Sequence, residues 1–245
     1  MSISLKALLL CFFRTYFIGA CNNLRGLQNI GLSFAIEPGL QELYPDFKEL
    51  KKARKRYLTL YNTHPFWTPL LVGYFLFLES KISKGVMAPA SLDKIKTTTI
   101  YTLSAIGDFF FGGALLIFWA LISICLLLAG GYIWGVLWFA IFFLLLHLFK
   151  FITFWLGWTQ GLAFLEKLQQ IDLIGWGQRI KFLNMLLLLI LWYIIFPWEK
   201  EGGKFFLGSA CLAGIGYIVY KQFISREILF FVFIASLVLF YILCS

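Results

Sequence analysis

Residues 109–149 read FFFGGALLIFWALISICLLLAGGYIWGVLWFAIFFLLLHLF, and in them two apolar runs meet at Gly130-Gly131. A helix that crosses a membrane needs about 20 mainly apolar residues, and each run is close to that length. Two adjacent glycines allow a tight turn between the runs. We therefore expect Phe109–Gly130 and Tyr132–Phe149 to form an antiparallel pair of membrane-spanning helices.

The composition of the whole chain points to the same environment. Of its 245 residues, 61% are hydrophobic and 13% are charged, whereas a soluble domain is about 45–50% apolar and about 25% charged. The net charge of +9 comes from short basic runs between apolar segments. That pattern sets orientation in membranes, and it does not indicate a nucleic-acid partner. The sequence predicts an all-α integral membrane protein.

Three shorter apolar segments follow the first two, so about five transmembrane helices are expected. The later segments are Phe182–Trp198, Phe205–Tyr220 and Ile228–Cys244. Because cytoplasmic loops are enriched in Lys and Arg, we expect the loop over residues 157–181 to lie inside the cell and the C-terminus outside. Residues 1–99 would then hold interfacial helices and a re-entrant hairpin, and residues 100–245 would form the transmembrane bundle.

The re-entrant hairpin is predicted over Pro65–Leu78, an apolar segment that is short and contains Pro69 and Gly73. Basic residues flank it on both sides, so the same rule places both of its ends in the cytoplasm. Non-helical backbone at membrane depth is tolerated only inside protein or beside a polar cavity. A ligand site is therefore expected near this segment.

A basic amphipathic helix is expected over Asp46–Tyr61, with Asp46 and Glu49 forming a capping box at its start. Its apolar face would consist of Phe47, Leu50, Ala53, Tyr57 and Tyr61, and its cations are Lys51, Lys52, Arg54, Lys55 and Arg56. Such a helix is typical of a membrane surface. The cations could dock a partner or anionic lipid, or they could serve orientation alone. The N-terminal segment, where Arg14 interrupts an apolar run, is expected to be an uncleaved interfacial helix.

Uncharged polar residues surround the hairpin: Asn23, Gln28, Asn62 and Thr63. Their side chains can donate and accept hydrogen bonds, which suits a neutral ligand rich in hydroxyl groups. Turn and cap chemistry is the alternative interpretation. Asp108 precedes the longest apolar run, where it could accept from a sugar hydroxyl or cap the helix that follows.

No catalytic constellation is visible in the sequence, which lacks a nucleophile–base pair, a glycine loop suited to phosphate and a cluster of metal-ligating residues. Its five cysteines are widely spaced and match neither a zinc site nor a disulfide framework. No catalytic residue, metal or cofactor is therefore predicted. His147, within an apolar run, is interpreted as a helix-packing contact.

Several of these segments resemble the IID membrane subunit of mannose-family phosphotransferase systems. That family shows Leu-Tyr-Pro, then Phe-Asn-Thr-x-Pro-Phe, then a Gly followed by Leu-Glu-Glu. This chain has Leu43-Tyr44-Pro45, then Tyr61-Asn62-Thr63-His64-Pro65-Phe66, then Gly73 and Leu78-Glu79. Leu103–Asp108 and Gly157–Gly161 are similar to two further family blocks.

The resemblance implies a transporter of hexose or hexosamine in the bacterial inner membrane, in which the subunit pairs with a homologous IIC subunit in a hetero-oligomer. Cytoplasmic IIA and IIB proteins would carry the phosphoryl group, so this subunit would not itself be an enzyme. The five residues Asn23, Gln28, Asn62, Thr63 and Asp108 would belong to the sugar pathway. The basic helix would dock IIB or bind membrane lipid.

The chain departs from the family pattern at Arg25 and Gly26, where the family has an acid and a base. The polar segment Glu199–Lys204 is also shorter than its counterpart in the family. These changes favour an alternative function, that of a non-transporting membrane scaffold or sensor with the same fold.

Overall fold

The computed structural model describes residues 3–196, 202–221, 227–228, 230–231 and 234. The chain divides into two compact units, residues 1–191 and 192–245. Within the described ranges the regular secondary structure is helical, and two isolated β-bridges accompany it. The predicted all-α fold is confirmed.

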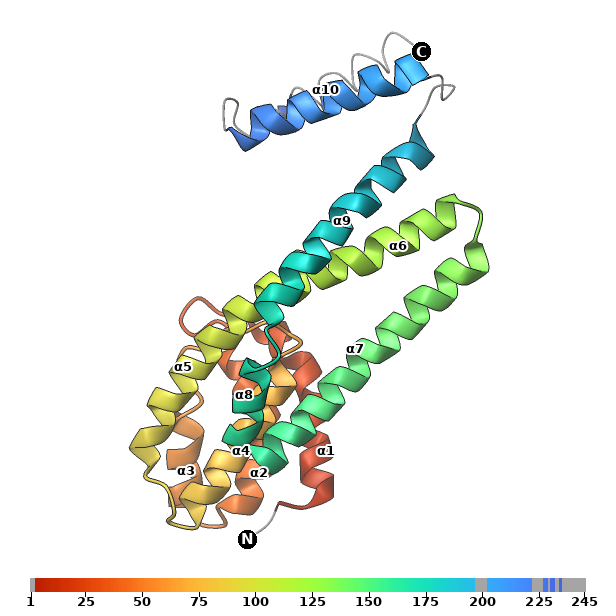
Figure 1. Cartoon of the computed structure of the whole chain (residues 1–245). Helices are drawn as coiled ribbons and strands as arrows, with labels where there is room; N and C mark the ends of the chain where they lie inside the picture. The colour runs from red at the N-terminus through yellow and green to blue at the C-terminus, as the bar shows by residue number, and fades with distance from the viewer. Residues whose placement is uncertain (1–2, 197–201, 222–226, 229, 232–233, 235–245) are drawn as a thin grey trace. The chain divides into compact units, whose positions relative to one another are not determined.

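A very long helix and its antiparallel partner dominate the first unit (Figure 1). The long helix consists of α5 (Pro89–Gly107), the π-helical segment η2 (Asp108–Leu115) and α6 (Leu116–Leu128) in direct succession, and α7 (Tyr132–Gln160) packs back along α6. The turn is tight, since Gly130 has φ +83° and the Gly131 amide donates to the carbonyl of Leu126 at 2.9 Å. The predicted hairpin at Gly130-Gly131 is confirmed.

The first helix of this hairpin begins at Pro89 and runs for 40 residues to Leu128. Asp108 therefore lies inside a helix, and the prediction that it caps a helix starting at Phe109 is wrong. The polar threonine-rich stretch before Gly107 folds as helix because it packs on α4 and contains no proline after Pro89.

Three helices in the described part of the chain are long and apolar enough to cross a membrane: Pro89–Leu128, Tyr132–Gln160 and Leu173–Ile195. The connection predicted over residues 157–181 is mostly helical and shorter than expected, because α7 continues to Gln160 and two helices follow it, α8 (Leu162–Gln169) and α9 (Leu173–Ile195). Its cytoplasmic location stays a prediction. Gly161, with φ +57°, makes the only sharp turn between α7 and α8.

The second unit contains α10 (Gly202–Tyr220), which covers the predicted apolar segment Phe205–Tyr220. The predicted segment Ile228–Cys244 lies largely outside the described residues, as do the C-terminus and residues 199–201 of the shortened polar segment. The number of crossings is therefore stated only for the described helices.

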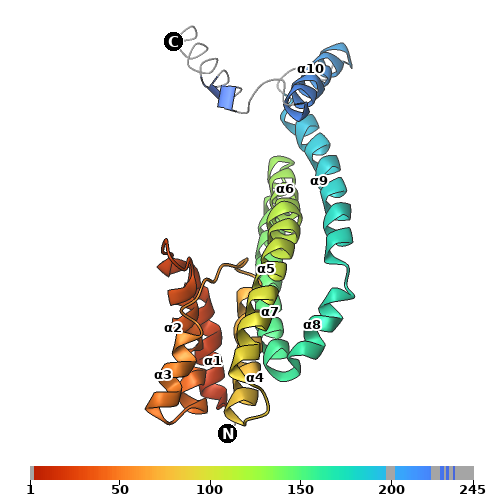
Figure 2. The ribbon, with the colours of Figure 1, turned by 90° about the vertical axis from the view of Figure 1, so that its left-hand side faces the viewer.

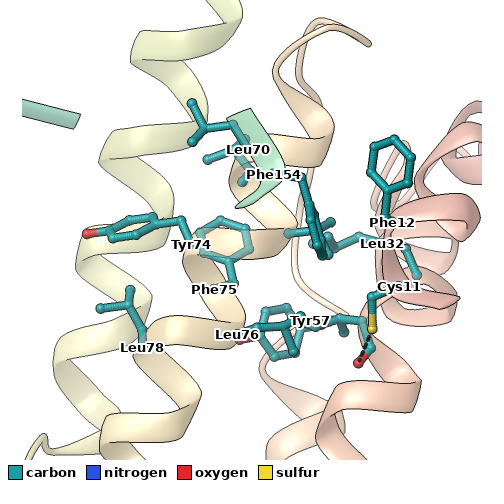
Figure 3. Close-up of a cluster of buried hydrophobic side chains, with 14 of the residues drawn as sticks. Cys11, Phe12, Leu32, Tyr57, Leu70, Tyr74, Phe75, Leu76, Leu78 and Phe154 are labelled. Atoms are coloured by element: carbon teal, nitrogen blue, oxygen red, sulfur yellow. Dashed lines mark hydrogen bonds between the residues drawn. The ribbon is translucent and has the colours of Figure 1, made fainter. Parts of the chain in front are cut away.

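α4 (Thr68–Ser83) lies at the centre of the first unit, and most of its residues are buried. It crosses α7 at two glycines. A Cβ added to Gly73 would lie 2.2 Å from the carbonyl oxygen of Phe154, and one added to Gly157 would lie 2.6 Å from that of Leu70. Backbones approach this closely only where small residues meet. Leu70 and Phe154 also belong to the buried cluster of Figure 3.

The N-terminal helices pack on α4 (Figure 2), and the ring of Phe12 also contacts Phe151 and Phe154 of α7. They are α1 (Leu5–Arg14), η1 (Thr15–Cys21) and α2 (Asn29–Leu43). Cys11 of α1 and Leu32 of α2 are completely or almost completely buried between them. The unit thus has a layered core with α4 as its shared element.

The expected re-entrant hairpin differs in detail from the structure, because α4 is one unbroken helix through Gly73. Pro69 sits in the first turn, where a helix has amides without partners anyway. The chain reverses its direction before α4. Residues 56–67 run along the unit without regular helical structure, and α4 then runs back in the opposite direction. As a result α3 (Phe47–Lys55) and the C-terminal end of α4 lie at the same end of the unit (Figure 2).

α3 is shorter than the helix predicted to reach Tyr61, because the following residues leave the helix and run towards α4. The Asp46 carboxylate accepts from the Glu49 amide at 3.0 Å, as predicted, while the Glu49 carboxylate binds Lys52 at 2.7 Å instead of closing a capping box. Leu50 and Ala53 are buried in the core of the unit, but Phe47 is 67% exposed. Tyr57 and Tyr61, which follow α3, are buried as well, so the predicted apolar side packs on protein except at Phe47. The location of α3 at a membrane surface stays a prediction.

Candidate functional site

Two irregular segments, residues 22–28 and 56–67, meet beside the first turn of α4. They pair through their backbones: the Gln28 amide donates to the carbonyl of Tyr61 at 2.9 Å, and the Tyr61 amide donates to that of Gly26 at 3.2 Å. Four of the five residues predicted for the sugar pathway lie on these two segments. We call this region the polar junction.

Asn23 holds the turn that begins the polar junction. Its side-chain nitrogen donates to Asn29 Oδ1 at 2.8 Å, and its side-chain oxygen accepts from the Gly26 amide at 2.8 Å. A Cβ added to Gly26 would lie 2.1 Å from Asn29 Nδ2, so the missing side chain lets the turn close. The departure at Gly26 has a local structural reason, and the contacts of Asn23 are those of turn chemistry.

Gln28 and Thr63 come together in the junction, since Gln28 Oε1 lies 3.5 Å from the Thr63 amide that donates to it. The Gln28 side chain lines a cavity of about 140 Å³ together with Thr15, Thr68 and Lys150. Thr63 is 3% exposed, and its hydroxyl has no hydrogen-bond partner among the described residues. This part of the junction therefore holds polar groups with spare hydrogen-bonding capacity.

Asn62 is exposed on a different cavity, of about 200 Å³, which it lines with Thr97, Tyr101 and Ser104 of α5. Successive side chains of an extended segment point to opposite sides. The structure thus separates Asn62 from Gln28, although the two lie on paired segments.

Asp108 lies beyond the junction, exposed on the helix that carries η2. A π-helix inside an α-helix is uncommon and often accompanies function. The neighbouring Gly107 packs on His64, because a Cβ there would lie 2.4 Å from His64 Cβ. Asp108 is therefore linked to the junction through His64 and makes no direct contact with the other four predicted residues.

His64 lies within stacking distance of Phe66 and Phe111, with ring centroids 5.4 and 5.3 Å away. Burial lowers the pKa of its imidazole; Asp108 partly offsets this effect and Lys150 adds to it. A neutral imidazole at physiological pH follows from this environment.

A buried charge network ties the motif residues together at the other end of α4. The Glu79 carboxylate is fully buried and accepts from Tyr44 at 2.7 Å, from Tyr57 at 2.8 Å and from Arg56 Nε at 2.9 Å. Burial raises the pKa of both tyrosines, and the Glu79 carboxylate raises it further, so both stay protonated and donate. Lys96, which is 2% exposed, binds the carbonyl of Arg56 beside this network.

The cations predicted for docking do not share one environment. Lys51, Lys52 and Lys55 are exposed. Arg54 forms an ion pair with Glu37. Arg56 is turned inward to Glu79, with its side chain 14% exposed, so it is not available at the surface of α3.

Two charged residues of these sites, Lys150 and Glu79, were not singled out as site residues from the sequence. The available signal was a charge inside an otherwise apolar helix, which usually faces a cavity or a partner. His147 was interpreted as a packing contact, and its ring stacks on Tyr16 at 5.7 Å. In the described part of the chain no three His, Cys, Asp or Glu side chains are grouped to hold a metal ion.

The fold and the polar junction define an all-α membrane protein with polar cavities between its helices. Residues 2–195 match the family described as the PTS system mannose/fructose/sorbose family IID component. The chain belongs to this family. The resemblance drawn from the motifs is thereby confirmed.

Among curated relatives, the chain is 27% identical over 152 residues to the PTS system mannose-specific EIID component of Escherichia coli K12. This alignment covers 61% of this chain and 52% of the relative. It is 27% identical over 158 residues to the fructose permease IID component of Bacillus subtilis 168, covering 64% of this chain and 56% of that one. The match thus spans about half the length of these relatives.

Two solved structures share the fold. One is described only as a membrane protein, with TM-score 0.68 and 22% identity over 78% of this chain and 71% of the other. The second is the cryo-EM structure of the mannose transporter ManYZ with microcin E492, with TM-score 0.59 and 23% identity over 78% of this chain and 70% of the other.

Proposed function

We propose that this chain is the IID membrane subunit of a phosphoenolpyruvate-dependent hexose phosphotransferase system and that it forms the translocation pathway with a IIC subunit. The observation that carries this proposal is the family match over residues 2–195, which includes both segments of the polar junction. The bacterial cytoplasmic membrane is the proposed location, with several crossings. IIA and IIB proteins would supply the phosphoryl group.

The proposed sugar pathway includes Gln28, Thr63, Asn62 and Asp108. Gln28 and Thr63 adjoin one polar cavity and Asn62 lines another. Neutral amide and hydroxyl groups can exchange hydrogen bonds with sugar hydroxyls without the desolvation cost of a buried charge. Asn23, whose side chain is occupied in its turn, would act as framework for this pathway.

The exposed lysines of α3 are proposed as the docking surface for the cytoplasmic IIB protein or for anionic lipid. They are Lys51, Lys52 and Lys55, and Arg54 borders them. A cluster of exposed cations attracts an acidic surface over about a Debye length, and salt weakens that attraction.

Hexose uptake by cells that express this chain with a homologous IIC subunit tests the proposal. The cells would lack other hexose permeases and contain IIA and IIB. We expect phosphoenolpyruvate-dependent uptake that falls at least about tenfold with Asn62→Ala, which removes an amide group, or with Asp108→Asn, which removes the negative charge of an acceptor. Asn22→Ala, on an exposed asparagine at the edge of the junction that is not one of the proposed pathway residues, is the matched control and should transport like the parent.

Two outcomes would separate the parts of the proposal. If both variants transport at the parental rate, the assignment of the pathway residues is wrong while the subunit role stands. If the parent pair moves no hexose although both subunits reach the membrane together, the chain acts as a scaffold or sensor.

A further inference from the structure

Lys150 of α7 is a cation in a helix apolar enough to cross a membrane, and it has no ion-pair partner among the described residues. Its ammonium group lies 4.7 Å from the ring centroid of Tyr16 and 4.7 Å from that of Phe66. The nearby charged group Asp108 influences His64 but forms no ion pair with Lys150. A lysine in such a position usually faces a cavity or a ligand.

The cavity that Lys150 lines is rich in hydrogen-bond donors. It has a volume of about 140 Å³, which is room for a few water molecules at roughly 30 Å³ each. Gln28 lines it as well, and because Gln28 Oε1 accepts from Thr63, its amide nitrogen remains as a donor. Lys150 adds three N–H groups and a positive charge. A cavity lined by a cation and an amide donor suits the oxygens of an anion.

The position of Lys150 along α7 indicates where that anion would come from. Lys150 follows the start of the helix at Tyr132 by about 27 Å at 1.5 Å per residue, close to the roughly 30 Å of a bilayer's hydrocarbon core. Tyr132 and Trp134, both 69% exposed, are typical of an aromatic belt at one interface. Lys150 would then lie at the opposite interface, at the depth of the lipid phosphates.

Exposed aromatic side chains lie close in sequence to residues that line the cavity. Phe17 follows the lining residue Tyr16 and is 62% exposed, and Phe13 is 60% exposed. Phe151, next to Lys150, is 40% exposed, and its ring packs on Phe12. Exposed aromatic side chains in segments that also supply a cationic cavity fit acyl chains beside a headgroup.

We propose that the cavity of Lys150 and Gln28 binds a phosphate group, with the Lys150 ammonium supplying the charge and the Gln28 amide nitrogen a further hydrogen bond. A lipid headgroup or a soluble phosphate ester offers the same chemistry. The proposal concerns the cavity that the proposed sugar pathway adjoins at Gln28, but phosphate binding there can be measured without hexose transport.

The test uses the full chain in maltoside micelles free of phosphate, with thermal unfolding as the readout. A ligand that binds only the folded state raises the midpoint as its concentration increases. The probes are dioleoylphosphatidylglycerol, dioleoylglycerol, which has the same chains without the phosphate, and glycerol 3-phosphate, which has the phosphate without the chains. We expect the phospholipid to raise the unfolding midpoint saturably and dioleoylglycerol not to do so.

Substitutions then assign the site. Lys150→Met should weaken the apparent affinity for the phospholipid at least about fivefold, as expected for one lysine at a lipid surface, and Lys150→Arg should restore it. Lys181→Met is the matched control, because Lys181 is also a lysine in an apolar helix with its ammonium over an aromatic ring, 3.8 Å from the centroid of Phe109, but it does not line this cavity. It should bind like the parent. If Lys150→Met fails to fold, Gln28→Glu serves instead, since it adds a carboxylate to the cavity and should abolish binding.

The outcomes either distinguish a lipid headgroup from a soluble phosphate ester or show that the cavity does not bind phosphate. A Lys150-dependent rise with glycerol 3-phosphate alone would support the phosphate site and identify a soluble ester as sufficient. Equal effects of the phospholipid and dioleoylglycerol would overturn the proposal. So would equal phospholipid binding by the parent and the cavity variants, Lys150→Met or Gln28→Glu.

Discussion

The hydroxyl group of Tyr44 donates to the buried carboxylate of Glu79 at 2.7 Å. Tyr44 ends α2 and Glu79 lies near the end of α4, so this bond joins two helices of the first unit. Arg56 binds the same carboxylate from the segment after α3. The Leu-Tyr-Pro and Leu-Glu motifs, far apart in sequence, thus meet in one charge network.

Arg56→Met should therefore destabilise the protein by about 3–5 kcal/mol, because it leaves the Glu79 carboxylate buried without its ion-pair partner. Denaturant or thermal unfolding in detergent micelles would measure the loss. The double variant Arg56→Met/Glu79→Gln should recover part of it, since the charge is then removed as well. Lys52→Met, which breaks the exposed pair with Glu49, is the control and should change stability by no more than about 0.5–1 kcal/mol. Similar effects of Arg56→Met and Lys52→Met would contradict the network.

Gly73→Ala and Gly157→Ala should each destabilise the first unit by about 1–3 kcal/mol through overpacking. The added methyl group would meet backbone atoms of the facing helix, which cannot move aside as a side chain can. Gly19→Ala is the control, because a Cβ at Gly19 meets nothing within 4 Å. The unfolding midpoints of the three variants give the comparison. A parental midpoint for Gly73→Ala would show that α4 and α7 do not cross as described.

His64 should make stability depend on pH on the acidic side of neutrality. Its pKa is lowered in the folded state, so below the ordinary value of about 6.5 the unfolded chain binds a proton that the folded chain does not. Stability should thus be constant above that value, fall as pH decreases through it, and level off below the folded pKa. Unfolding measured from about pH 8 to about pH 5 would reveal this slope. His64→Gln should flatten it, and an unchanged slope in that variant would assign the titration to another group.

Cys11 should resist modification while the protein is folded. Burial raises the pKa of its thiol to about 12, and the side chain is completely buried, so little thiolate is present to react. Cys21, which is exposed, is the matched control. In single-cysteine variants a water-soluble maleimide should label Cys21 rapidly and Cys11 only after denaturation. Rapid labelling of Cys11 in the folded protein would disagree with the packing of α1 on α2.

Local sequence was sufficient for several features of the fold. The apolar runs on either side of Gly130-Gly131 determined a helical hairpin, because a span without water must satisfy its backbone hydrogen bonds internally. The cap of α3 at Asp46 likewise depends on residues three positions apart. Expectation and structure differ at the starts and ends of the spans and in the unbroken α4. There Pro69 is accommodated in the first turn, and close packing against α7 overrides the local signal of Gly73.

Contacts between distant residues were decided by the tertiary structure alone. Local spacing indicated that Asn62 and Thr63 are polar groups near a membrane segment, but only the pairing with residues 26–28 places Thr63 beside Gln28 and leaves Asn62 on a separate cavity. In the sequence Arg56 is one of several cations in a predicted basic helix, and only the fold brings its side chain into contact with Glu79. Hydropathy and capping act over one or two helical turns, whereas the partner of a buried charge depends on which helices pack together.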